Sequence, residues 1–313
     1  MQGLRPLDPR HDFPEIVGLI ELGFREEMDP LGQKLLAQMR RRACYGIWSQ
    51  LLWGGPLNLE GFVWEEQGRV VGNLSLRRAL PAWNDGRIIG NVVVHPECRG
   101  RGIARALMQA AEATSRTAGA RWLGLEVRAD NAAAYALYTH LGFRAVGAVE
   151  HFLHSGTPWP RVDAPRTIWR RSQPLDRLLW AGLAEKTMSR IQAQVLEIRP
   201  DLYTFGGFER ILDLWFNRER EMAWIEDTPD PQLAVSIQTD LRRRFHVWEL
   251  LVSPDADESR VQEAVSRAFA SVSSHRHWPV VTFVNSKTVL ANVLQQLGFV
   301  RHRLLTQMYR VLD

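Results

Sequence analysis

Cysteine is almost absent from this chain, which has only Cys44 and Cys98 among its 313 residues. Two cysteines cannot supply a disulfide framework or the ligand spacing of a zinc site, so a reducing compartment is the expected environment. Long apolar runs are also missing, and the first residues, MQGLRPLDPRHDF, lack the apolar core of a signal peptide. We therefore expect a cytoplasmic protein with no bound metal and no membrane partner.

An excess of one charge is lacking as well. The 39 lysines and arginines face 35 aspartates and glutamates, which gives a formal net charge of +4. This mild excess suits an anionic small ligand as well as a nucleic acid, so it identifies no partner, and we expect no specific nucleic-acid partner. The hydrophobic content of 45% is typical of a globular protein, and the length favours two domains over one.

Strand and helix signals alternate through the first 170 residues. Asp12 and Glu15 have capping-box spacing, which predicts that a helix begins there. The order of the signals predicts an α/β domain, with a mixed, mostly antiparallel sheet flanked by helices, that ends near Pro174. The expected strands are 61–64, 70–76, 87–94, 122–128, 143–153 and 166–170, and the expected later helices are 31–43, 102–119 and 131–141.

The stretch VHPECRGRGIARAL, residues 94–107, joins an expected strand to an expected helix. Gly100 and Gly102 allow the backbone to turn tightly and to approach a ligand closely. The first N–H groups of the helix have no internal partner and carry partial positive charge. Arg99, Arg101 and Arg105 add full positive charges at the same place. The combination predicts a cradle for a phosphate group.

The kind of phosphate follows partly by exclusion. A dinucleotide fingerprint needs a small residue where Arg105 stands, and the chain has no P-loop motif. The remaining pattern, Arg99-x-x-Gly102-x-Ala104, resembles the acetyl-CoA pyrophosphate signature of the GNAT N-acetyltransferase superfamily. The alternative is an ordinary strand-to-helix turn with surface arginines.

A second motif supports the same resemblance. The stretch LEVRADNAAAYALYTHLGF, residues 125–143, is similar to the later part of the GNAT pattern and most similar to the ribosomal-protein-alanine N-acetyltransferase branch. Glu126, Asn131 and Tyr138 stand at the matching positions. The resemblance covers about residues 1–170. It implies the GNAT fold and the transfer of an acetyl group from acetyl-CoA to a primary amine, by direct attack in a ternary complex.

The resemblance also implies how the cosubstrate is held. Main-chain groups of Val92, Val93 and Val94 would bind the pantetheine arm like an added strand, and one N–H would polarise the thioester carbonyl. The loop from Gly100 to Arg105, which includes Ile103 and Ala104, would hold the pyrophosphate. Asn131 would contact the cofactor arm, although an asparagine before a helix can also be a plain N-cap.

Two side chains are candidates for the proton transfers. Tyr138 is the expected general acid, because the pKa of a phenol is similar to that of the CoA thiol whose thiolate departs. Alternatively, its side chain packs on the inner face of its helix. Glu126 is the expected general base, acting directly or through water, and burial would have to raise its pKa. Its alternative is a structural ion pair with Arg128 or Arg105. Ile88 occupies the strand position of another base known in the family, so a mechanism without a base also stays open. Cys98 beside the cradle has no linked histidine and is expected to be incidental.

The second half of the chain resembles a repeat of the first, which predicts a duplicated domain. We expect a catalytic domain over residues 1–172, a linker helix over 173–195 and a degenerate GNAT-like domain over 196–313. Four ordered matches carry this expectation: Leu4-Arg5-Pro6 with Ile198-Arg199-Pro200, Leu19–Phe24 with Ile211–Phe216, Val94-His95-Pro96 with Val252-Ser253-Pro254, and Leu141-Gly142-Phe143 with Leu297-Gly298-Phe299.

The repeat lacks the residues that carry chemistry in the first half. Acidic and bulky side chains replace the cradle, so the copy is expected to bind no pyrophosphate and to act as a structural half. The matched positions are Arg99 and Asp257, Gly100 and Glu258, Gly102 and Arg260, Asn131 and Lys287, and Tyr138 and Leu294.

Two classes of function stay open at this point. The first is an acetyl-CoA-dependent N-acetyltransferase, and the alternative is a non-catalytic protein that binds or senses CoA or acetyl-CoA. The acceptor would be a small-molecule or peptide amine. It would be bound near Glu26, Glu27 and Asp29 or near Glu150, His151 and His154, which could equally be solvated loop residues. The chain would be a monomer with an internal pseudo-dimer, or a homodimer.

Overall fold

The computed structural model describes residues 3–9, 11–24, 29–40, 60–80, 83, 85–160, 164–205, 218–275, 277–285 and 288–312. The chain forms two compact units, each made from separate stretches of sequence. Unit 1 consists of Met1–Glu126, Ala133–Arg144 and Met308–Asp313, and unit 2 consists of Val127–Ala132 and Ala145–Gln307.

The sheet of unit 1 is antiparallel except for one pair of strands. The strands lie in the order β1-β2-β3-β4-β5, and only β4 and β5 run parallel, as the helical crossover between them requires. The strands are β1 (Gly3–Pro6), β2 (Glu60–Glu66), β3 (Arg69–Arg78), β4 (Gly86–Val94) and β5 (Trp122–Arg128).

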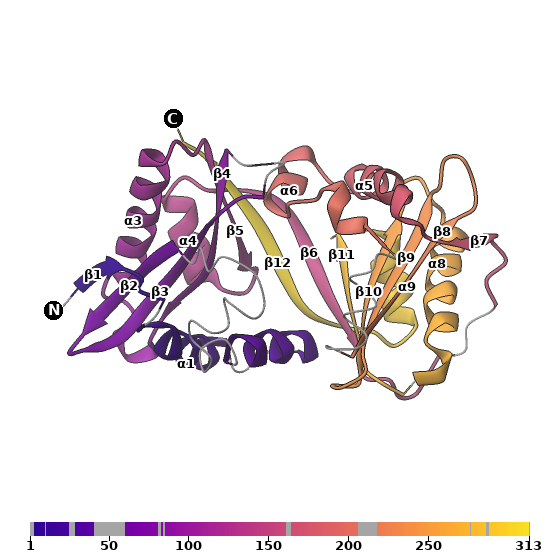
Figure 1. The fold of residues 1–313 in the computed structure, drawn as a ribbon, viewed down its shortest axis with the longest axis horizontal. Helices are drawn as coiled ribbons and strands as arrows, with labels where there is room; N and C mark the ends of the chain where they lie inside the picture. Colours follow the sequence, from indigo (N-terminus) through magenta and orange to yellow (C-terminus); the bar gives the residue numbers. More distant parts are fainter. Residues whose placement is uncertain are drawn as a thin grey trace. The chain divides into compact units, whose positions relative to one another are not determined.

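Helices cover both faces of this sheet (Figure 1). Helix α1 (Phe13–Phe24) buries Ile16 and Ile20 against strand residues that include Val63 and Val93. Helix α3 (Ile103–Thr117) packs on the opposite face, where Ile103 and Leu107 lie over Gly72. The apolar residues of α1 recur three and four positions apart, so one face of the helix is apolar. Residues 30–40 and α4 (Ala132–His140) are also helical.

The last residues of the chain complete unit 1. They come from β12 (Val300–Val311), whose final residues lie beside β5. Tyr309 stacks on Trp122 with the ring centres 5.5 Å apart, and the Leu312 N–H donates to the Arg121 carbonyl over 2.7 Å. Conversely, β6 (Arg144–His154) belongs mostly to unit 2, where it pairs with β11. Each compact unit is thus built from both halves of the sequence.

Unit 2 repeats the arrangement of strands and helices seen in unit 1. Its sheet has the order β6-β11-β10-β9-β8-β7, and β10 and β11 are the parallel pair. Helices α8 and α9 cover one face and α5 covers the other. The strands are β7 (Trp169–Arg171), β8 (Glu219–Glu226), β9 (Leu233–Asp240), β10 (Phe245–Val252) and β11 (Val280–Asn285), and the helices are α5 (Arg177–Lys186), α6 (Arg190–Val195), α8 (Glu258–Ser271) and α9 (Val289–Gln296).

A bidentate ion pair shows where the structural repeat begins. In unit 1 the guanidinium of Arg5 on β1 donates to both carboxylate oxygens of Asp12, each over 2.7 Å, just before α1. In unit 2 Arg170 on β7 donates to both oxygens of Asp176, over 2.7 and 2.8 Å, just before α5. The counterpart of β1 is thus β7, near residue 169.

This register corrects two expectations. Residues 198–200 are not the counterpart of Leu4-Arg5-Pro6, because Pro200 begins a 3-10 turn rather than ending a strand. Residues 173–195 are not a linker helix, because α5 and α6 belong to unit 2 and Trp180 and Leu183 are buried in its core. Two other sequence matches agree with the structure. Strands β4 and β10, which end at the matched Val94 and Val252, both lead into a helix. The matched Gly142 and Gly298 have φ of +86° and +87°. Residues 211–216 lie outside the described residues.

Candidate functional site

Strands β4 and β5 separate partway along their length. Their parallel pairing ends at Ile89 and Leu125, whereas β4 continues to Val94. The pairing of β4 with β3 shifts register between Asn73 and Ser75, which is a β-bulge, and Asn91 in the bulge has φ of +52°. A bulge bends its strand and increases the local twist, so it turns the end of β4 away from its neighbour.

Asn73 holds this bulge from the neighbouring strand. Its side chain is fully buried, and its Nδ2 donates to the main-chain carbonyl of Asn91 over 2.9 Å. Its Oδ1 has no hydrogen-bond partner in the described part of the chain. Asn73 is not among the residues expected at the site, although a polar side chain inside the apolar strand VVGNLSL was the available signal.

Main-chain groups at the end of β4 that do not pair with β3 face the region where β4 and β5 separate. The His95 N–H donates to the Val71 carbonyl of β3 over 2.8 Å. Main-chain groups alternate in direction along a strand, so those of Val93 also point toward β3, and those of Val92 and Val94 point away from it. Arg99 Nε donates to the Val94 carbonyl over 3.2 Å, which agrees with that direction. These valines therefore present main-chain groups beyond the last pair of β4 and β5.

The loop after β4 presents an open cradle at the beginning of α3. Gly100 and Gly102 have φ of +77° and +79°, and, apart from the glycine and its two chain neighbours, no described residue has an atom within 4 Å of the position that a Cβ would occupy on either. Gly102 is the N-cap of α3 and provides no side-chain cap. The first intrahelical bond is from Ala106 N to Gly102 O, so the amides of Ile103, Ala104 and Arg105 have no intrahelical acceptor. Such a helix end attracts anions.

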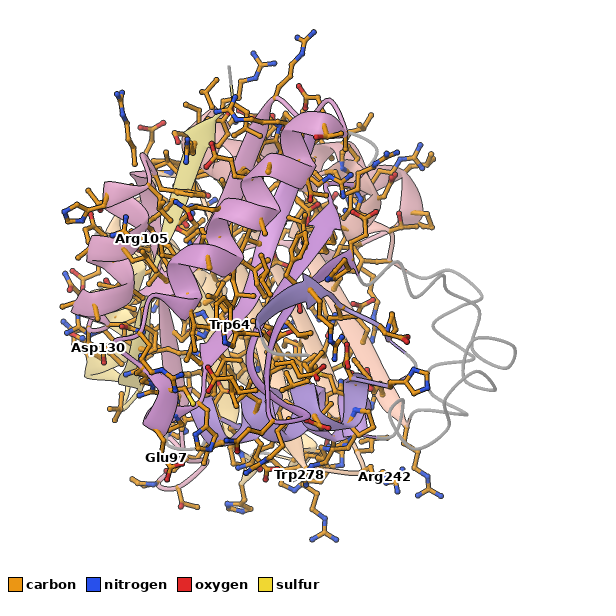
Figure 2. All side chains as sticks on the ribbon, turned by 90° about the vertical axis from the view of Figure 1, so that its left-hand side faces the viewer. Trp64, Glu97, Arg105, Asp130, Arg242 and Trp278 are labelled. Atoms are coloured by element: carbon orange, nitrogen blue, oxygen red, sulfur yellow. The ribbon has the colours of Figure 1, made fainter. Side chains whose placement is uncertain are left out.

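The three arginines near the cradle differ in what they contact. Arg105 is exposed and has no ion-pair partner among the described residues, whereas Arg99 is exposed and bonds to Val94. Arg101 instead donates to Glu66 Oε1 over 2.7 Å, and the same oxygen accepts from Trp64 Nε1. Figure 2 shows unit 1 with α3 in the foreground and labels Trp64 and Arg105. Glu66 compensates the charge of Arg101, so the remaining positive charge at the cradle comes mainly from Arg99 and Arg105.

Tyr138 is the buried residue of α4. Its side chain is 5% exposed and lies against Phe143, with the ring centres 6.1 Å apart. Burial raises the pKa of the phenol to about 12. The hydroxyl is therefore protonated throughout the physiological pH range, and it can donate a proton but not accept one.

Glu126 and Asn131 are less enclosed than their expected roles require. The Glu126 side chain is exposed, so the burial that was expected to make it a stronger base is not found. Asn131 is also exposed and stands directly before α4, and its N–H donates to the Arg128 carbonyl over 3.1 Å. The roles of both residues stay predictions.

The residues expected near the acceptor amine have structural surroundings. Asp29 accepts from the Gly32 N–H over 2.7 Å and so caps the helix at 30–40. His151 and His154 are buried in unit 2, on β6, and Glu150 is buried with Arg301 3.7 Å from its carboxylate. None of these four side chains is a solvated loop residue. Glu26 and Glu27 lie outside the described residues.

The corresponding helix of unit 2 begins differently. Asp257 is the N-cap of α8, and its carboxylate accepts from the Arg260 N–H over 2.9 Å and from Ser259 Oγ over 2.8 Å. Glu258 adds a second acidic group in the first turn. The chain's own carboxylate thus occupies the position at which an anion would bind.

The described residues contain no group of three or more histidine, cysteine, aspartate or glutamate side chains that could hold a metal ion. Within the same residues, no helix is both long and apolar enough to cross a membrane. Cys98 is buried in the short 3-10 turn after β4 and forms no disulfide.

Comparison with known proteins bears on both the site and the fold. Residues 31–143 match the model of the acetyltransferase (GNAT) family, a range that includes the whole cradle, Glu126, Asn131 and Tyr138. None of the curated proteins matches the sequence.

Several solved structures have the same fold as the whole chain. A tandem GNAT protein from the clavulanic acid biosynthesis pathway is 17% identical, with a TM-score of 0.63 over 99% of this chain and 98% of that one. A GCN5-related N-acetyltransferase from Sphaerobacter thermophilus is also 17% identical, with a TM-score of 0.65 over 98% and 95%. One from Anabaena variabilis is 14% identical, with a TM-score of 0.54 over 99% and 73%. Residues 31–143 are therefore similar to the GNAT acetyltransferase family, and the chain as a whole has the tandem GNAT fold.

Proposed function

We propose that the chain is an acetyl-CoA-dependent N-acetyltransferase whose working site lies in unit 1. The observation that carries the proposal is the uncapped beginning of α3, where Gly100 and Gly102 leave open space beside three free amides. Arg99 and Arg105 add positive charge there. This arrangement fits the diphosphate of acetyl-CoA, because charge-assisted bonds from amides and guanidinium groups are among the strongest hydrogen bonds in proteins.

The end of β4 is suited to the next part of the cosubstrate. The main-chain groups of Val92 and Val94 point away from β3 and past the last pair with β5. An extended pantetheine arm can bond to such groups as an added strand does. An N–H there can also stabilise the negative charge that develops on the thioester oxygen during attack by the amine.

Tyr138 is proposed to donate the proton that the departing thiolate needs. A phenol whose pKa is raised to about 12 stays protonated until that moment. Acetyl-CoA supplies an activated acyl group, and the chain's residues hold it and provide the proton. The exposure of Glu126 favours a bound water or the bulk solvent as the acceptor of the amine's proton.

Unit 2 is proposed to be a structural copy that does not bind the cosubstrate. Its helix α8 is capped by Asp257, and its β9–β10 pairing continues without the register shift present in β3–β4. A second carboxylate, Glu258, would repel a diphosphate at this helix end.

The acceptor is proposed to be a primary amine, and the ribosomal-protein-alanine branch is one source of it that the sequence resemblance suggests. The alternative function is a CoA sensor without catalysis. The presence of a tyrosine at position 138 favours the enzyme, since a sensor needs no acid there.

Calorimetry with acetyl-CoA, followed by a thiol-release assay across a panel of amines, tests the proposal. We expect saturable binding and release of CoA thiol with at least one class of primary amine. Binding without release for every amine would support the sensor. Absence of binding would contradict both functions.

A further inference from the structure

Two arginines of unit 2 contact the same tryptophan ring. The guanidinium carbon of Arg267 on α8 lies 3.5 Å from the ring centre of Trp224 on β8, and that of Arg171 on β7 lies 4.7 Å from it. Arg171 stands directly opposite Trp224 in the pairing of the two strands. The two positive charges therefore lie within a Debye length of each other and repel.

Neither charge has an acidic partner in the described part of the chain. The carboxylates closest along the same strand and helix are engaged elsewhere: Glu226 pairs with Arg260, and Glu263 accepts from the main-chain N–H groups of residues 166 and 167. Burial and the neighbouring Arg171 both lower the pKa of Arg267. Stacking on an indole offsets part of this cost, but it leaves the N–H edges of the guanidinium groups without a counterion.

Buried N–H donors in the same cluster also lack acceptors. Arg267 Nε and Trp224 Nε1 are inaccessible to solvent and make no hydrogen bond with the described residues. A buried donor without an acceptor lowers stability, because it has lost its hydrogen bonds to water and gained none in the protein. A fixed group of donors with excess positive charge is what an oxyanion requires.

We propose that Arg171, Trp224 and Arg267 bind a phosphate group. Guanidinium groups recognise phosphate oxygens through paired N–H bonds, and the Trp224 ring holds the two guanidinium groups beside each other. Phosphate is favoured over a single carboxylate because its charge near pH 7 matches that of two arginines. The cluster is separate from the beginning of α8, since Arg267 lies about 13 Å further along the helix axis. The proposal concerns unit 2 and does not depend on acetyl-CoA binding to unit 1.

Calorimetry on the full chain with inorganic phosphate tests the proposal, in chloride buffer of constant ionic strength and without acetyl-CoA. Wild type is expected to show saturable binding and a rise in Tm. The double variant Arg171→Gln, Arg267→Gln should bind at least tenfold more weakly. Trp224→Phe should bind several-fold more weakly, because its smaller ring attracts the two guanidinium groups less strongly and positions them less well. Arg177→Gln, which removes an exposed charge on α5, is the control and should bind as wild type does.

The source of the phosphate is distinguished by a second probe. O-Phosphoserine that binds more tightly than inorganic phosphate would assign the site to a phosphorylated partner, and the reverse order would assign it to the free ion. Circular dichroism confirms that each variant folds; if the double variant does not, Arg171→Gln alone carries the test, because Arg171 is exposed. Wild type that binds no phosphate, or a folded variant of Arg171 that binds it as tightly as wild type, would overturn the proposal.

Discussion

Arg310, three residues from the end of the chain, donates to both carboxylate oxygens of Glu112 on α3, over 2.8 and 2.6 Å. Both side chains belong to unit 1 and are about one-fifth exposed. The helix that begins at the phosphate cradle is thus fixed, near its other end, by the last strand of the polypeptide. The folding of the proposed working site therefore depends on residues from the second half of the sequence.

The first prediction concerns this ion pair. Arg310→Gln should lower the free energy of unfolding by about 1.5 kcal/mol, because it removes a charge-assisted bidentate contact of low exposure. Thermal and urea unfolding of the full chain measure the effect. Arg116→Gln is the comparison, since Arg116 contacts Glu112 from the adjacent helical turn and is more exposed. An equal loss for both variants would show that the C-terminal contact is no more than a surface pair.

The second prediction concerns the proton donor. Tyr138→Phe should lower kcat for acetyl transfer about 10²- to 10⁴-fold, the range found for general acids, and should change the Kd for acetyl-CoA less than threefold. The phenylalanine keeps the contact with Phe143, so stability should be nearly unchanged. Spectrophotometric titration should place the phenol pKa near 12. A variant that transfers acetyl groups as fast as wild type would contradict the assignment.

The third prediction concerns Asn73. Asn73→Leu keeps the branching at Cγ but removes the bond to the Asn91 carbonyl, so the bulge in β4 should lose its fixed geometry. We expect kcat to fall roughly tenfold, with a loss of stability of about 1–2 kcal/mol. Ser75→Ala is the control, because Ser75 Oγ accepts only a 3.3 Å bond from Asn91 Nδ2. If activity at a temperature well below Tm is unchanged, the bulge does not depend on Asn73.

The fourth prediction concerns acid stability. Burial, with the neighbouring Arg303, lowers the pKa of His151 to about 3, and its Nδ1 accepts from Arg303 Nε over 3.0 Å. In the unfolded chain the His151 side chain takes up a proton near pH 6.5, whereas in the folded chain it stays neutral down to about pH 3. The contribution of His151 to the free energy of unfolding is therefore present above pH 6.5 and is lost as the pH falls toward 3.

His151→Asn supplies a non-titrating acceptor for Arg303 and tests that contribution. The variant should lose less stability than wild type between pH 6.5 and pH 4. Urea unfolding at several pH values measures the difference. His154 and His246 also have pKa values lowered by burial, so the variant should reduce the acid sensitivity without abolishing it. An identical pH dependence in variant and wild type would show that His151 does not titrate in this way.

Local features of the site were predictable from the sequence. The glycine spacing predicted the tight turn, and Gly100 and Gly102 both have positive φ. The apolar periodicity predicted the strands on either side, since it reflects burial of one face of the sheet. The expected helix at 102–119 and the expected strand at 122–128 correspond to α3 and β5.

Long-range features were not predictable in the same way. Nothing local in β6 or β12 indicates that β6 pairs with β11 in unit 2 or that Tyr309 stacks on Trp122 in unit 1. The sequence match placed the repeat 29 residues too late, at Arg199 instead of Arg170, because Ile198-Arg199-Pro200 is similar in sequence to β1. The feature that repeats is an ion pair between an arginine on an edge strand and an aspartate just before a helix. This pair is a contact between residues that are not adjacent in the sequence, so local sequence similarity did not indicate it.

The direct test of the central claim compares two glycines of α3. Gly102 at its beginning and Gly119 just beyond its end have φ of +79° and +73°, and each has open space around the Cβ position. Alanine at either position should cost a similar backbone strain of about 1–2 kcal/mol. Calorimetry with acetyl-CoA should therefore show affinity reduced at least tenfold in Gly102→Ala and unchanged in Gly119→Ala. Equal affinities in the two variants would contradict a cosubstrate site at the beginning of α3.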